Sequence, residues 1–234
     1  MFPSKLTRSI VVGAVAIAVA GGSYGIVSAT SSSPAAASST PPAASSSGGG
    51  GSNARSGPAA GGSSGTVGSV STSGFTITTS AGQKVTVDEA SSTTYQNGTS
   101  PASASAVTTG EPVLVLGTVN NTTITATQVT VQPAGSEGSA ASSAAGVVPF
   151  QQGAPATSKT VGQIPADYTQ GSGTLASGTT ANKATEAALA AYPGGIVDRV
   201  VELSNGGYEV HYIGVNWPHH IFVNQDFKVI GAND

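Results

Sequence analysis

The chain has 234 residues, of which 8% are charged and 5% aromatic, and it carries a formal net charge of −3 and no cysteine. The absence of cysteine excludes disulfides, thiolate metal sites and cysteine nucleophiles, and the few cations exclude the basic face that a nucleic-acid-binding protein needs. An ordinary soluble domain has roughly 25% charged residues, so only part of this chain has the composition of a folded domain.

Residues 1–29 are predicted to be a signal peptide or a signal anchor. Lys5 and Arg8 precede an uncharged run that extends to Ala29. Its first half is typical of the apolar region of a secretory signal peptide, and Val27-Ser28-Ala29 offers the small residues of a cleavage site. The whole run of about 20 residues is also long enough to span a bilayer, with its basic side in the cytoplasm. We therefore expect an extracytoplasmic protein, secreted or anchored, that contacts the membrane through this segment only.

Two tracts, residues 30–64 and residues 133–179, consist mainly of Ala, Ser, Gly, Thr and Pro. Such a composition buries too little apolar surface to offset the entropy that ordering the chain costs. Both tracts are therefore predicted to be disordered linkers on either side of a first folded domain.

Residues 65–132 are predicted to form that first domain, a small five-stranded β-barrel. Apolar and polar residues alternate in the strands, and Asn120-Asn121 is a turn signal between the last two. A longer connection, residues 90–109, follows the third strand. The predicted strands are Thr66–Val70, Phe75–Thr79, Lys84–Val87, Val113–Val119 and Thr122–Val131.

The segment from Gly65 to Asp88, followed by Gly110 to Val131, resembles a bacterial extracytoplasmic domain of unknown function with an OB-like β-barrel. The shared features are an initial Gly-x-Val, a Phe-x-Ile strand, a Val-x-Val strand and a later Gly-x-x-Val-x-Val-x-Gly. Many OB folds bind oligonucleotides or oligosaccharides. Phe75 and Tyr95 are the only aromatic residues of residues 65–132, and Phe75 is expected in the core, so no stacking platform for bases or sugars is predicted.

Residues 180–234 are predicted to form an α+β domain, in which one helix packs on an antiparallel β-meander. The helix begins near Thr180, places Thr185, Ala188, Leu189 and Tyr192 on one face, and ends at Pro193-Gly194-Gly195. Strands at Ile196–Leu203, Tyr208–Ile213, His220–Asn224 and Phe227–Ile230 follow. A two-residue turn at Asn205-Gly206 would pair Leu203 with Tyr208, Val201 with Val210 and Arg199 with Tyr212, all under the helix. The opposite face would then carry Asp198, Val200, Glu202, Glu209, His211 and Ile213.

This order of a helix and a meander resembles the PepSY-like domains of exported actinobacterial proteins. The matching elements include Ala187–Ala191, Pro193-Gly-Gly, Val197-x-Arg199-Val and Gly207-Tyr-Glu-Val-His211. The resemblance implies a small binding or inhibitory module and no catalytic residue. The chain departs from the family at Asn216–His220, where relatives usually carry a short turn.

Candidate binding residues lie in this second domain. Glu202, Glu209 and His211 are weak candidates for a divalent-metal site, and the alternative is a solvated polar face without a ligand. Trp217, Pro218 and His219 are candidates for binding a partner, and the alternative is that Trp217 covers the open end of the core. His219 and His220 would point to opposite faces of a strand, so they are poor joint ligands.

We find no phosphate-binding loop, dinucleotide fingerprint, nucleophile elbow or metalloprotease motif in the sequence. No catalytic residue and no cofactor are therefore predicted. The expected function is a non-enzymatic binding or regulatory module of the bacterial cell envelope, with a protein or peptide ligand. The alternatives are an exported protein that binds a divalent metal or small ligand, and a structural cell-wall spacer.

Overall fold

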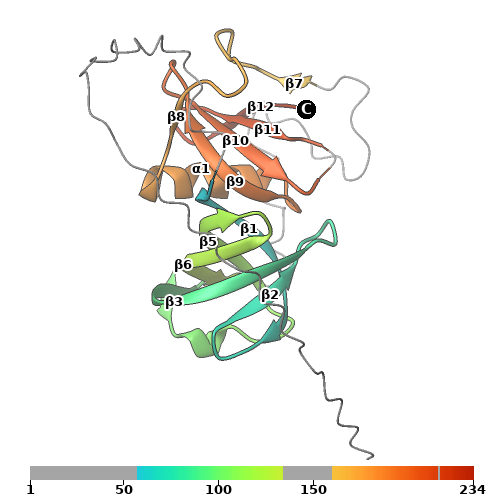
Figure 1. Ribbon diagram of the computed structural model, residues 1–234, viewed down its shortest axis with the longest axis vertical. Helices are drawn as coiled ribbons and strands as arrows, with labels where there is room; N and C mark the ends of the chain where they lie inside the picture. The colour runs from blue at the N-terminus through green and yellow to red at the C-terminus, as the bar shows by residue number, and fades with distance from the viewer. Residues whose placement is uncertain (1–56, 134–159, 216) are drawn as a thin grey trace, which may run out of the picture. The chain divides into compact units, whose positions relative to one another are not determined.

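The computed structural model of the protein describes residues 57–133, 160–215 and 217–234. The first part of the fold is a closed five-stranded β-barrel, drawn from cyan to yellow-green in Figure 1. The barrel closes in the order β1–β2–β3–β6–β5–β1, with β3 and β6 parallel and the other neighbours antiparallel. This confirms the predicted barrel. Its strands are β1 (Ala59–Val70), β2 (Gly74–Thr78), β3 (Lys84–Asn97), β5 (Pro112–Asn120) and β6 (Thr123–Val131).

Two barrel strands are longer than predicted. Strand β3 continues to Asn97 and forms a hairpin with β4 (Ser100–Ala102). Part of residues 90–109, which were expected to be a connection, therefore forms β-strands. Strand β1 begins at Ala59, inside the tract that was predicted to be a linker. Its glycines lie where backbones come close together: a Cβ on Gly61 would lie 2.0 Å from the carbonyl oxygen of Val197, and one on Gly62 would lie 2.3 Å from that of Val115. The small residues of this stretch therefore serve close packing.

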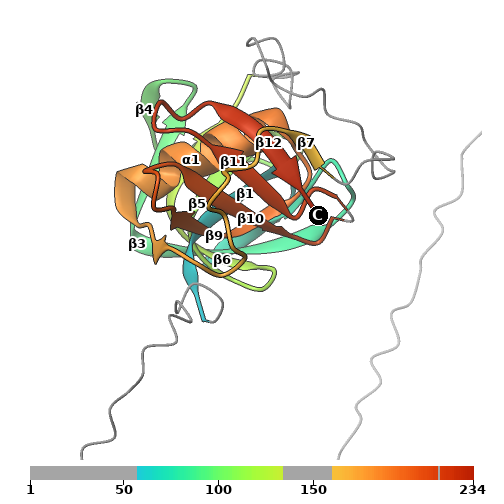
Figure 2. The same cartoon turned by 90° about the horizontal axis from the view of Figure 1, so that it is seen from above.

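The second part of the fold is a sheet with one helix against one of its faces (Figures 1 and 2). Helix α1 (Gly178–Ala191) begins after Ser177 and buries Ala181, Ala184, Thr185, Ala188 and Leu189. These side chains pack with Val200, Val210 and Tyr212 of the sheet. This sheet, which we call the α1 sheet, consists of β9 (Ile196–Glu202), β10 (Tyr208–Ile213), β11 (His220–Val223) and β12 (Val229–Asn233), all antiparallel.

A strap, defined here as residues 160–176, crosses the face of this sheet that α1 leaves open. It begins as β7 (Thr160–Gly162) beside β12 and ends as β8 (Thr174–Leu175) beside β9. In between, the ring of Tyr168 packs edge-on against Phe222 with ring centroids 4.7 Å apart. The linker prediction was therefore wrong for residues 160–176, and residues 134–159 lie outside the described part.

The predicted register of the β9–β10 hairpin was wrong by one residue. Leu203 and Gly207 close the hairpin around a three-residue loop, with Gly207 accepting from the Leu203 N–H at 2.8 Å. Gly206 takes φ +77°, the left-handed conformation that such a loop requires. Val200 therefore pairs with Val210. A one-residue shift exchanges the two faces of β9, so Val200 faces the helix while Arg199 and Val201 face the strap.

The barrel and the second sheet share one continuous sheet. Gly62 and Ser63 of β1 pair with Val197 and Ile196 of β9, and the Ser63 hydroxyl donates a buried hydrogen bond to the Gly195 carbonyl oxygen at 3.0 Å. Ile196, a residue of β9, is buried in the barrel core. The expectation of two separate domains on a flexible spacer is therefore corrected: the two parts pack into one unit.

Candidate functional site

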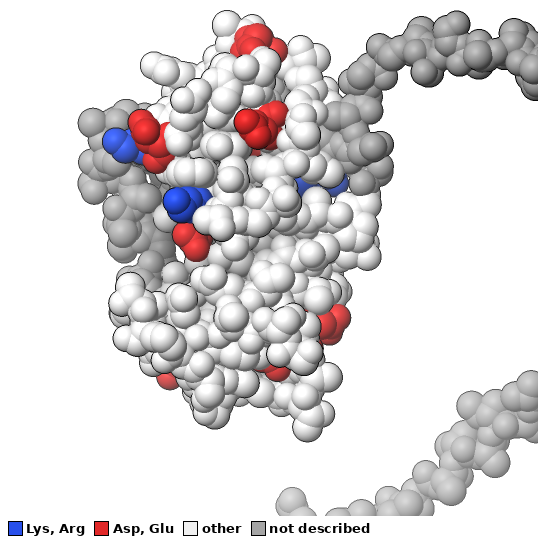
Figure 3. Space-filling view, turned by 90° about the vertical axis from the view of Figure 1, so that its left-hand side faces the viewer, with Lys and Arg blue, Asp and Glu red and all other residues white. Residues whose placement is uncertain are grey.

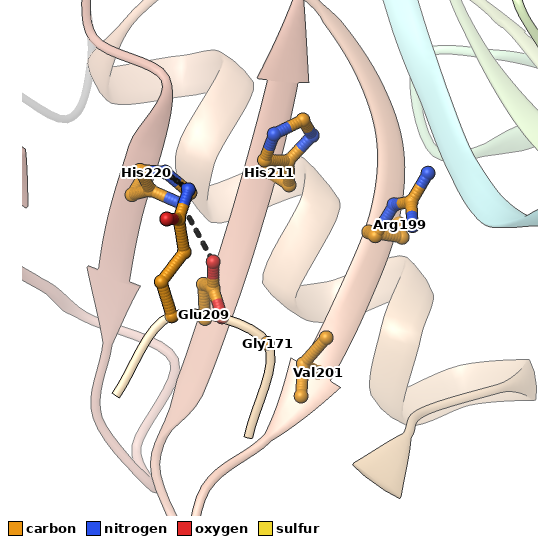
Figure 4. A pocket seen from close by; sticks show the side chains of 7 residues that line it. Gly171, Arg199, Val201, Glu209, His211 and His220 are labelled. Carbon is orange, nitrogen blue, oxygen red and sulfur yellow. Dashed lines mark hydrogen bonds and ion pairs between the residues drawn. The ribbon is translucent and has the colours of Figure 1, made fainter. Parts of the chain in front are cut away.

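A polar pocket of about 310 Å³ lies between the strap and the face of β9, β10 and β11 that is turned away from α1 (Figure 4). Each strand supplies side chains from positions that alternate with core residues, so polar groups collect on this face. The lining residues are Gln170, Gly171, Arg199, Val201, Glu209, His211 and His220.

A β-bulge brings Asp198 into this group. The register shifts between His211 and Tyr212, so that both Asp198 and Arg199 lie opposite His211. Asp198 Oδ2 accepts hydrogen bonds from Arg199 Nε at 2.9 Å and Nη2 at 2.7 Å, and Asp198 Oδ1 lies 2.5 Å from His211 Nδ1. Burial raises the pKa of the Asp198 carboxyl, but the hydrogen bonds and charges of His211 and Arg199 outweigh burial and lower the pKa below 3.8.

Glu209 and His220 form a second carboxylate–imidazole pair, and this pair is almost fully buried. Their side chains are 5% and 4% exposed, and Glu209 Oε1 lies 2.6 Å from His220 Nδ1. The Tyr168 hydroxyl of the strap donates to the same oxygen at 3.1 Å. The Gln170 side-chain nitrogen lies 3.2 Å from His220 Nε2. An amide nitrogen can only donate, so in this arrangement His220 Nε2 accepts from Gln170 and Nδ1 carries the proton that faces Glu209.

The two pairs meet in the pocket. The rings of His211 and His220 lie edge to face with centroids 5.1 Å apart. Two polar atoms on residues that line the pocket, Glu209 Oε2 and His211 Nε2, have no hydrogen-bond partner among the described residues. In the neutral form of His211, Nδ1 donates to Asp198 and Nε2 offers a lone pair, so both atoms are then acceptors without a donor.

A second pocket, of about 340 Å³, lies beside the first, on its barrel side. It shares Arg199 and His211 with the first pocket and reaches Asn120 and Asn121 in the turn between β5 and β6. We call the two pockets together the polar groove. Figure 3 shows that charged side chains are few and scattered on the face that it displays.

The predicted metal ligands are not brought together. Glu209 and His211 line the same pocket, but Glu202 is exposed and pairs with Tyr208, on the face toward α1. Among the described residues, no group of three or more His, Asp or Glu side chains could hold a metal ion.

The predicted partner-binding residues lie apart from the polar groove. Trp217 is only 7% exposed and packs edge-on against Tyr192, with ring centroids 5.8 Å apart. Its place in the core corresponds to the alternative interpretation, in which it covers the core of the α1 sheet. Pro218 is buried as well, and His219 lies 3.9 Å from the Asp234 carboxylate.

Sequence reasoning missed Tyr168, Gln170, Arg199 and His220 as parts of the site. The first two belong to the strap, where Tyr168 is the one aromatic residue that could have signalled burial. Arg199 was placed on the wrong face by the register error. His220 was considered only together with His219, and the sequence does not reveal that it lies across from Glu209.

Within the described ranges, no helix is both long and apolar enough to cross a membrane. The apolar segment of residues 1–29 lies outside these ranges. Comparisons of the chain with protein-family models, curated proteins and solved structures found no match. The case for a function therefore rests on the side chains of the polar groove.

Proposed function

We propose that the protein is a non-enzymatic binding module of the bacterial cell envelope, and that it holds a protein or peptide segment in the polar groove. The observation that carries this proposal is that two adjacent pockets share Arg199 and His211 in their linings. Together they offer donors, acceptors and the apolar side chain of Val201 along one path from the strap to the β5–β6 turn. Such a path suits an extended chain, which presents backbone polar groups at regular intervals.

The lining of the groove supports binding in preference to covalent catalysis. Asp198 orients His211 in the way that an acid orients the base of a hydrolytic triad. However, neither pocket is lined by a serine, threonine, cysteine or tyrosine among the described residues. His211 therefore has no nucleophile beside it to activate.

The proposal places the groove outside the cytoplasm. Lys5, Arg8 and the apolar run that follows support export by a signal peptide or anchor. The barrel's strand order, with a parallel pair closing the sheet, supports an OB-like barrel. The succession of one helix and four antiparallel strands supports a PepSY-like module.

A peptide-selection experiment tests this function. The full chain is immobilised and exposed to a random peptide library, and selected peptides are then measured against His211→Gln. We expect sequence-related peptides that bind the wild type and lose about tenfold or more in affinity with the variant. Lys183→Gln, on the exposed side of α1, is the control and should bind as the wild type does. Failure to select any related peptides, or equal binding by His211→Gln, would overturn the proposal.

A further inference from the structure

Among the described residues, Glu209 is paired with His220 and with no Lys or Arg side chain. Its Oε1 atom accepts from the Tyr168 hydroxyl and from the Nδ1–H of His220, while Oε2 accepts nothing among the described residues. The side chain is 5% exposed. A buried carboxylate whose hydrogen-bonding capacity is only partly used is costly, and a cation placed beside it would remove much of that cost.

The nearby guanidinium of Arg199 does not fill this role. Arg199 directs Nε and Nη2 to Asp198, and His211 binds the other oxygen of the same carboxylate. The charges of Arg199 and Asp198 therefore balance each other. Arg199 is the one Lys or Arg side chain among the residues that line the pocket, so Glu209 has neither of these cations to itself.

The free acceptors match an ammonium group. Such a group carries three N–H donors on one compact charge, at the end of a flexible alkyl stem when it belongs to lysine. Glu209 Oε2 and the His211 Nε2 lone pair can each receive one donor, and Val201 provides an apolar surface for the stem. The pocket volume of about 310 Å³ leaves room for a four-carbon stem.

We infer that the pocket beside Glu209 takes a protonated primary amine, with Glu209 Oε2 and His211 Nε2 as its acceptors. This inference rests on the proposed function, because it names the part of a bound peptide that enters the pocket, a lysine side chain. A free alkylamine presents the same chemistry, and the experiment separates the two sources.

The test uses the ring-proton NMR signals of the chain's three histidines. The full chain at about pH 8, where a primary alkylamine is protonated, is titrated with n-butylammonium chloride and with a short lysine peptide. Matched peptides carry acetyl-lysine, glutamine or arginine at the same position. We expect the signals of His211 and His220 to shift with n-butylammonium and with the lysine peptide, while those of His219 stay in place. Acetyl-lysine and glutamine should weaken peptide binding about tenfold or more.

Two variants with the same change of charge complete the test. Glu209→Gln keeps the shape of the side chain and should abolish the shifts, whereas Glu202→Gln, exposed on the other face of the sheet, should leave them intact. Equal loss in both variants, equal binding of the lysine and acetyl-lysine peptides, or a preference for arginine would overturn the inference. The acetyl-lysine comparison uses the wild type, so it decides the question even if Glu209→Gln fails to fold.

The two proposals fail in different ways. If n-butylammonium binds at Glu209 and no peptide is selected by the groove, the amine site stands and the peptide function falls. If peptides bind through His211 regardless of lysine, the peptide function stands and the amine site falls.

Discussion

Shortening a side chain inside the barrel should destabilise the distant core around Trp217. We consider Ile77→Ala, because Ile77 is fully buried in the barrel and has no part in the α1 sheet. Truncation of a buried isoleucine to alanine costs about 2–5 kcal/mol. In a folded unit of this size, each kcal/mol lowers Tm by roughly 2–4 °C, so a decrease of at least about 4 °C is expected.

The junction at β1 and β9 determines whether that loss reaches Trp217. Burial of Ile196 in the barrel core contributes about 1.5–3 kcal/mol, and the buried hydrogen bond from Ser63 to Gly195 contributes about 0.5–1.5 kcal/mol. The α1 sheet with its strap is a small unit, and a core of that size rarely supplies more than about 3–5 kcal/mol by itself. Without the junction it would be left with little stability. The two parts should therefore unfold together.

The assay follows Trp217, the only tryptophan of the chain, which is buried in the core of the α1 sheet. Its fluorescence midpoint in Ile77→Ala should fall by the same amount as the midpoint from circular dichroism. Val70→Ala, at a 49% exposed position of the same barrel, is the control and should change neither midpoint. A fluorescence midpoint that stays at the wild-type value while circular dichroism reports early loss of strands would refute the coupling.

Two further predictions concern the polar groove. Tyr168→Phe keeps the ring against Phe222 but removes the hydroxyl that donates a hydrogen bond to Glu209. Urea unfolding should therefore show that the free energy of unfolding falls by about 1–3 kcal/mol. An unchanged unfolding midpoint would contradict the role of this bond. Folding lowers the pKa of the Asp198 carboxyl below its ordinary value of 3.8. The ionised carboxylate therefore stabilises the fold at a pH above that ordinary value, and the stabilisation is lost as the pH falls through the lower pKa of the folded state. The stability difference between the wild type and Asp198→Asn should therefore shrink as the pH falls below about 3.8, and a constant difference would show that charge is not the cause.

The elements that the sequence predicted are those whose side chains repeat with a clear period. Alternation identified the five barrel strands, and the spacing of Thr185, Ala188 and Leu189 identified the buried face of α1. The first half of β1 and the strap have no such period, because their residues are mostly small. At Gly61 and Gly173 a Cβ would lie within 2.5 Å of a backbone oxygen of a neighbouring strand, so glycine at these positions lets the two backbones pack closely. Composition alone does not distinguish that use of glycine from a linker.

The candidate site was predicted only in part, because it depends on contacts between distant segments. Glu209 and His211 were identified as neighbours on one face from the alternation along a single strand. His220 reaches them through the pairing of β10 with β11, and Tyr168 and Gln170 reach them through the path of the strap. Such contacts are fixed by tertiary packing, for which a short sequence window carries no signal.

The bulge in β9 explains how two adjacent residues of one strand both serve the same site. In a regular strand Asp198 and Arg199 would point to opposite faces, and the carboxylate would enter the core beneath α1 without a partner. The extra residue lets both side chains reach the face of His211, where each neutralises the other. Val197 and Val200, on either side of the pair, still face the helix. The bulge thus keeps the core apolar and orients His211 through Asp198, on the face that also carries Glu209.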